Sequence, residues 1–145
     1  MPAAGRIDPY LNFRFRVEID GIAQAGFMEC TGLGSQIEVV EYREGGDNAS
    51  VHKLPGKVSY PDIVLKWGIT DSQELYQWHL QAIQGNLVRK EGSVVLLDSQ
   101  GHEKLRWNFF SAWPSKWTGP TLNAKGHDVA IEELTLTCER QAQAT

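Results

Sequence analysis

The chain has 145 residues, of which 41% are hydrophobic and 22% charged, and its formal net charge is −4. This length fits one domain with its own core, so we predict a single domain over residues 1–145. No apolar run approaches the roughly 18 residues of a membrane-spanning helix, and the acidic balance gives no reason to expect a specific nucleic-acid site or stable membrane insertion. The first residues hold one early Arg6 and no apolar signal-peptide core, so synthesis in the cytoplasm without a signal peptide is expected.

The first half of the chain is dominated by alternating patterns. Apolar and polar residues alternate strictly over residues 11–20, which predicts a half-buried strand. Asp20-Gly21 then predicts a tight turn, because glycine tolerates a positive φ, and residues 22–30 are expected to fold back antiparallel to the first strand. A third strand is predicted over residues 36–43.

Residues 44–57 read EGGDNASVHKLPGK and are rich in residues typical of turns. We predict a long loop over this segment. Long loops without secondary structure are uncommon in compact domains and are usually functional or ordered by a partner. An intermolecular role for the segment is therefore expected.

A strand and a helix follow the predicted loop. Residues 60–70 read YPDIVLKWGIT and place apolar side chains on both faces of a strand, which needs cover on both faces. Residues 72–84 carry an apolar stripe at helical spacing, and Asp71 and Glu74 stand in capping-box register, so we predict one helix here.

The remainder of the chain predicts further strands, over residues 93–97, 104–113 and 128–140, with a connecting loop over 114–127. In the last strand the apolar parity changes, which indicates either a bulge near Glu132-Glu133 or two covered faces. Residues 140–145 are expected to form a C-terminal tail. The predicted fold class is mainly β, a sandwich or barrel with one flanking helix, and its open strand edges favour self-association.

No catalytic, cofactor or metal site is predicted. The four histidines are too dispersed to place two ligands on one metal ion. Cys30 and Cys138 are interpreted as small buried thiols in preference to a disulfide. Trp117, in the predicted loop beside Lys116, is a candidate surface or interface anchor.

Six blocks of sequence carry a family resemblance. They are DPYLNFRFRVEIDG (8–21), GFMECTGLGSQIEVVEYREGGDN (26–48), KLPG (53–56), GITDSQELYQWH (68–79), WNFFSAWPSKWTGP (107–120) and NAKGHDVAIEELTLTCE (123–139). Together they resemble the tail tube proteins of contractile phages, and in particular the inner-tube subunits of phage-tail-like extracellular contractile injection systems. The resemblance covers about residues 8–139, in order.

The resemblance implies a barrel-like tail-tube fold whose copies form hexameric rings stacked into a hollow tube. It also implies a contractile sheath, baseplate and spike proteins as partners, and cargo in the lumen. The particle would assemble in the cytoplasm, with later release from the cell as an option. Two alternatives stay open: a phage tail tube that conducts DNA, and a stand-alone ligand-binding β-module.

The resemblance also implies that residues 44–57 form an inter-subunit loop. We expect Leu54 and Pro55 to anchor this loop and Gly45-Gly46 to act as its hinge, and we expect residues 1–8 to be a flexible N-terminus. Because a channel that passes cargo should be polar, four polar residues are lumen candidates. These are Gln36, Glu38, Arg14 and Arg16.

Overall fold

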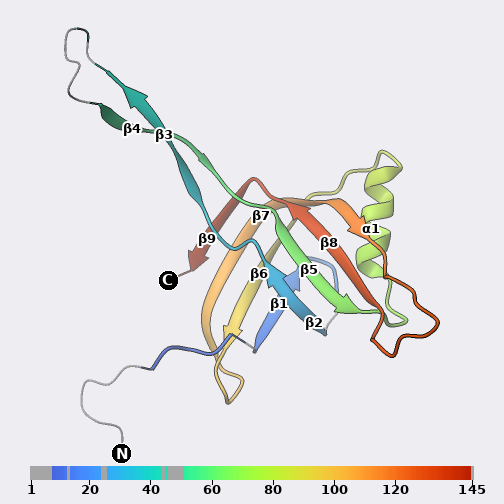
Figure 1. The fold of residues 1–145 in the computed structure, drawn as a ribbon. Coiled ribbons are helices and arrows are strands. Elements are labelled where there is room, and N and C mark those ends of the chain that lie inside the picture. The colour runs from blue at the N-terminus through green and yellow to red at the C-terminus, as the bar shows by residue number, and fades with distance from the viewer. Residues whose placement is uncertain (1–7, 13, 24–25, 44, 46–50, 145) are drawn as a thin grey trace, which may run out of the picture.

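The computed structural model describes residues 8–12, 14–23, 26–43, 45 and 51–144. Within these residues the chain forms nine strands and one helix (Figure 1). In order they are β1 (Phe15–Ile19), β2 (Phe27–Thr31), β3 (Gln36–Tyr42), β4 (His52–Ser59), β5 (Ile63–Gly68), α1 (Glu74–Ile83), β6 (Lys90–Leu97), β7 (Glu103–Thr118), β8 (Ile131–Thr137) and β9 (Arg140–Ala144). The predicted mainly-β fold with one flanking helix is confirmed. No described helix is long and apolar enough to cross a membrane.

Seven of the strands form one antiparallel sheet in the order β1-β6-β7-β8-β5-β2, with β9 also paired to β7. The 16-residue strand β7 connects the two halves of this sheet, because its first part pairs with β6 and β9 and its last part with β8. At Ser111 the backbone takes a positive φ of 53°, and after it the buried residues change from Phe109 to Ala112 and Pro114. Such an irregularity bends a strand, so β7 can serve both halves.

The core lies between the two halves of the sheet and is closed by α1. Its buried members are Val17, Ile19, Ile63, Leu65, Trp67, Leu75, Trp78, Val94, Phe109, Ala112, Leu134 and Leu136. Strand β5 shows why it forms here, since buried and half-buried residues alternate along its whole length. Val64, on its second face, is half-buried. The sequence predicted that both faces of this strand would be covered, and within one chain the face that carries Val64 is covered only in part.

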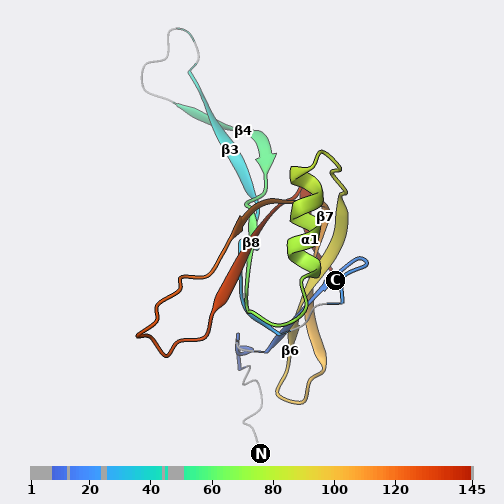
Figure 2. The ribbon, with the colours of Figure 1, turned by 90° about the vertical axis from the view of Figure 1, so that its right-hand side faces the viewer.

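The helix α1 lies alongside β7 (Figure 2). Leu75 and Trp78 are buried, and the Trp78 indole N–H donates to the carbonyl oxygen of Val88 at 2.7 Å. The predicted capping box does not form. The Glu74 carboxylate instead accepts a hydrogen bond from the backbone N–H of Ala23 at 2.8 Å, which ties the start of the helix to the segment after β1.

The predicted pairing of the first two strands is wrong. The Asp20-Gly21 turn forms, with a φ of +75° at Gly21, but among the residues described here a single bridge, between Ile19 and Ile22, follows it. β2 then pairs with β5, and β1 pairs with β6. The physical reason is burial, because Phe27 and Cys30 pack against the core from the opposite half of the sheet.

Two predictions about the C-terminal third are also corrected. β8 pairs with β5 in continuous register, so of the two alternatives for the last strand the bulge near Glu132-Glu133 is absent there, and the shift lies in β7 between Pro114 and Lys116. This shift lets β7 continue through Pro114, which cannot donate to a ladder, into the segment predicted as a loop. Residues 140–144 form β9 on β7, where a tail was expected.

Candidate assembly surfaces

Strands β3 and β4 form a separate two-stranded hairpin that projects away from the body of the molecule (Figures 1 and 2). Every residue of both strands is exposed. The loop predicted over 44–57 is therefore wrong for residues 52–57, which belong to β4. Pro55 is compatible with this strand because a two-stranded ribbon has an outer edge that needs no N–H donor.

The hairpin is apolar on both of its faces. Val39 pairs with Pro55 and Ile37 with Val58, which places these four side chains on one face. Val39 is 62% exposed.

The other face is formed by the alternate residues. Val40 pairs with Leu54 and Tyr42 with His52, with the Tyr42 and His52 rings 6.5 Å apart. Gly56 lies beside Val40 at the register shift, and a Cβ on it would lie 2.9 Å from Val40 Cγ2. An isolated two-stranded ribbon is marginal in water, and contiguous exposed apolar residues mark interaction sites. The hairpin thus carries exposed apolar side chains on each of its two faces.

The four residues predicted in the inter-subunit loop are placed as follows. Leu54 and Pro55 lie on opposite faces of β4, so each could contact a different neighbouring surface. Gly45 lies in a turn after β3, and Gly46 falls outside the described residues. The anchoring and hinge roles stay predictions. Sequence reasoning missed Val39 and Val40, although the adjacent apolar pair in QIEVVEY already indicated two apolar faces.

Trp117 lies in β7 and not in a loop. Its indole N–H donates to the Glu132 carboxylate at 2.8 Å, and its ring packs edge-to-face with that of Tyr76 on α1, with the ring centres 5.0 Å apart. The side chain is half-buried and packs against the core. Its role as an anchor to another subunit stays a prediction.

The four lumen candidates lie in two separate places. Gln36 and Glu38 are on the hairpin, whereas Arg14 precedes β1 and Arg16 lies within it. Arg14 donates to the backbone carbonyl of Ser99 at 2.9 Å. The structure therefore does not gather the four into one lining, and the lumen assignment stays a prediction.

Arg16 belongs to a charged cluster on the outer surface of β1, β6 and β7. Arg106 donates to Glu103 at 2.7 Å and to Glu18 at 3.0 Å, and Arg16 Nε lies 3.3 Å from Glu18. The hydrogen bond from Arg106 lowers the pKa of Glu103, and the two carboxylates raise the pKa of Arg106. Val95, between Arg16 and Arg106 in register, is fully buried. The arginine stems can cover this apolar side chain.

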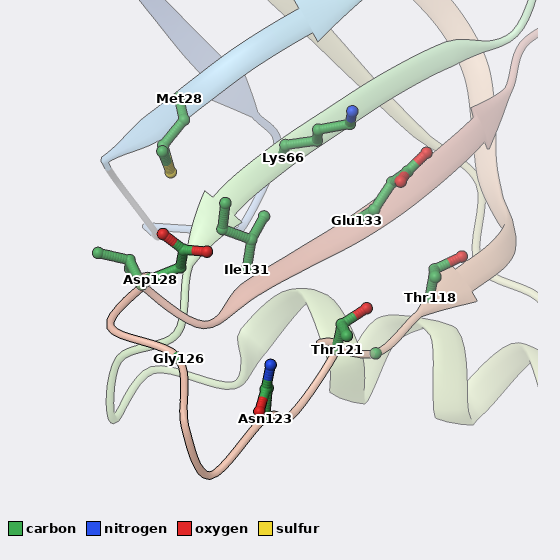
Figure 3. A pocket seen from close by; sticks show the side chains of 11 residues that line it. Met28, Lys66, Thr118, Thr121, Asn123, Gly126, Asp128, Ile131 and Glu133 are labelled. Atoms are coloured by element: carbon green, nitrogen blue, oxygen red, sulfur yellow. The ribbon is translucent and has the colours of Figure 1, made fainter.

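An open concavity of about 680 Å³ lies on the outer face of β2, β5 and β8, where residues 119–130 fold back beside the sheet (Figure 3). Lys66 and Glu133 line it, and Lys66 Nζ lies 3.1 Å from the Glu29 carboxylate. This hydrogen bond raises the pKa of Lys66. Lys66 and Glu29 are both accessible to solvent and have the arrangement of a surface ion pair.

The two cysteines are free and half-buried. Burial raises the pKa of Cys30 to about 11 and also raises the pKa of Cys138. Neither thiol has the low pKa of a nucleophile. Among the described residues, no group of three His, Cys, Asp or Glu side chains could hold a metal ion.

Comparison with known proteins gives one family and several similar structures. The family model described as T4-like virus tail tube protein gp19 matches residues 11–141. A chain in the extended-state sheath/tube terminator of PVC, an extracellular contractile injection system, is 30% identical, with 96% of this chain and 99% of that chain covered and a TM-score of 0.85. A chain in the cap of the anti-feeding prophage (AFP), which terminates its tube, is 29% identical, with coverage of 99% and 96% and a TM-score of 0.86.

A more distant structure shows the fold alone. Hcp1 from Flavobacterium johnsoniae is 14% identical, with 89% of this chain and 93% of that chain covered and a TM-score of 0.54. The search of curated protein sequences gives no match.

Proposed function

The chain belongs to the T4-like virus tail tube protein family, and from this premise we propose that its copies form hexameric rings that stack into the inner tube of a contractile injection system. As a tail tube protein of an injection system or phage tail, it is a structural component of a phage-tail-like particle. Its proposed work is mechanical and non-enzymatic. Sheath contraction drives the tube through a target envelope, and the lumen carries cargo.

The observation that carries the ring and tube proposal is the two-faced apolar hairpin. Val39 and Pro55 on one face and Val40 and Leu54 on the other are exposed in a single chain. Burying apolar surface is worth about 25 cal/mol per Å², so covering both faces gives a substantial drive for association. In a ring or tube each subunit has neighbours on two sides, so both faces of its hairpin can be covered. A monomer covers neither face, and a simple dimer covers one.

Relatives favour an injection system over a phage tail as the particle. The two chains at 29% and 30% identity come from structures of AFP and PVC, the second of which is named as an extracellular contractile injection system. Other similar chains come from a baseplate and from a sheath-tube complex. We therefore propose sheath, baseplate and spike proteins as partners, with a DNA-conducting phage tail as the alternative particle.

The rival function, a stand-alone ligand-binding module, has less support. Its proposed contact, Trp117, already packs against Tyr76 and hydrogen-bonds to Glu132. The 680 Å³ concavity is open to solvent and lined by both polar and apolar residues, unlike the enclosed pockets typical of small ligands.

The test is the oligomeric state of the purified protein. Light scattering after size exclusion should give a mass six times 16.2 kDa, and negative-stain images should show rings that stack at high concentration or with the cognate sheath and baseplate proteins. A protein that stays monomeric even with those partners present would refute the proposal.

A further inference from the structure

The side chain of Gln141 on β9 lies where the two legs of the β3–β4 hairpin join the body. Its Nε2 donates to the carbonyl oxygen of Gly32, before β3, at 3.0 Å and to the carbonyl oxygen of Pro61, after β4, at 3.0 Å. Its Oε1 accepts from the N–H of Gly34 at 3.1 Å. One primary amide thus bonds to the backbone of both legs through its donor and its acceptor, and the same Nε2 also lies 3.7 Å from Cys138 Sγ.

The two legs are in close contact at this point. Gly32 has a φ of +97°, and a Cβ on it would lie 1.9 Å from the carbonyl oxygen of Asp62. A Cβ on Gly34 would contact the Pro61 ring at 3.6 Å. The hairpin ladder itself starts further out, with Gln36 opposite Ser59. The Gln141 amide therefore bonds to the segment between the ladder and the body, where a change of backbone angle would redirect the whole hairpin.

Gln141 is itself held by a fixed element. β9 pairs with β7 from Arg140 opposite Phe110 to Ala144 opposite Arg106. The Arg140 guanidinium also lies 4.1 Å from the centre of the Phe110 ring. The amide thus connects the hairpin to β7, the strand that joins both halves of the sheet.

We propose that Gln141 is a positioning residue that sets the direction in which the β3–β4 hairpin leaves the subunit. A hairpin of eight residues reaches about 26 Å at 3.3 Å per residue, so a rotation of about 10° at its base moves its tip by roughly 5 Å. That displacement exceeds what close-packed apolar contacts tolerate. The consequence for assembly rests on the function proposed above, whereas the positioning itself does not.

The variant for the test is Gln141→Glu, which keeps the size and the acceptor for Gly34 but removes both donors and faces two carbonyl oxygens with a carboxylate. Gln143→Glu is the matched control, because Gln143 lies on the same strand and is exposed. Spin labels are attached at Lys53 on β4 and Gln81 on α1, through ketone-bearing residues introduced at these positions so that the native cysteines stay unlabelled. The distance between the two labels reports the direction of the hairpin. Labelled chains are diluted with unlabelled ones, so that the distances are measured within one chain.

The Gln141→Glu distance distribution should broaden or shift by several ångströms, while that of Gln143→Glu stays at the wild-type value. An unchanged Gln141→Glu distribution overturns the positioning role. A broadened distribution with normal ring assembly retains that role and refutes the proposed function of the hairpin.

A second measurement needs no variant. In the wild-type protein the amide proton of Gly34 should exchange at least ten times more slowly than an unprotected amide, because it donates to Gln141 Oε1. Exchange of Gly34 at the unprotected rate overturns the proposal, including in the case that the Gln141 variants do not fold.

Discussion

Val40 on β3 lies directly opposite Leu54 on β4, and both side chains remain exposed in the single chain, at 41% and 48%. A cross-strand apolar pair normally lies on the buried face of a sheet. Here the pair faces solvent on a projecting hairpin, and in the proposed ring it would be buried by a neighbouring subunit. The pair is therefore a direct way to separate folding from assembly.

Replacing this pair should abolish assembly and leave the fold intact. For Val40→Asp with Leu54→Asp, we expect the thermal midpoint to stay within about 3 °C of wild type, since exposed substitutions change stability by about 0.5 kcal/mol or less each. Two charges placed in a desolvated interface should raise the concentration needed for ring formation by at least tenfold. Light scattering across a concentration series measures this.

The control for that experiment is the same change at an exposed polar position on another element. Gln81→Asp on α1 adds a charge away from the hairpin and should assemble as the wild type does. If both variants assemble normally, the hairpin does not carry the association.

Gly32 should be intolerant of even the smallest side chain. Gly32→Ala forces a φ of +97° on a residue with a Cβ and drives that Cβ to 1.9 Å from Asp62 O. We expect a loss of roughly 3 kcal/mol or more, because backbone overlap adds to the cost of the left-handed conformation. Gly101→Ala is the matched control, since its φ is +84° but nothing lies within 4 Å, and it should lose only about 1 to 2 kcal/mol. Urea unfolding compares the two, and equal losses would show that the contact with Asp62 is unimportant.

A strand that buries one face in the core of its own chain was predictable from sequence, and a strand without such burial was not. β5 has a buried residue at every second position, so its burial in the fold follows the alternation of its sequence. β4 buries nothing within the chain, so its apolar residues show no periodicity of burial, and its Gly, Pro and Lys residues are typical of a loop. The role of Gln141 had no signal in sequence, since three backbone groups distant along the chain create it.

The charged cluster around Arg106 should make stability depend on acid. The hydrogen bond from Arg106 lowers the pKa of Glu103 below its ordinary value of 4.5, so the folded state binds this proton less readily than the unfolded state. The stabilisation is present above pH 4.5 and is lost as the pH falls through the lowered pKa. In the wild type, the urea concentration at the unfolding midpoint should fall between about pH 5 and 3, and in Glu103→Gln this fall should be smaller. Glu139→Gln, which removes an exposed carboxylate 4.0 Å from Arg89, is the control, and an identical acid dependence in all three proteins would contradict the expectation.

The two thiols should react slowly and in a fixed order. Burial raises the pKa of Cys30 to about 11, so at pH 8 its thiolate fraction is up to roughly 100-fold below that of an ordinary cysteine. Burial also raises the pKa of Cys138, but Gln141 Nε2, 3.7 Å from its Sγ, favours the thiolate and partly offsets this effect. Timed alkylation with mass spectrometry should show Cys138 modified first in the native protein, and both thiols modified at similar, faster rates in urea. Faster modification of Cys30 in the native protein would mean that the packing of β2 against the core is opened in solution.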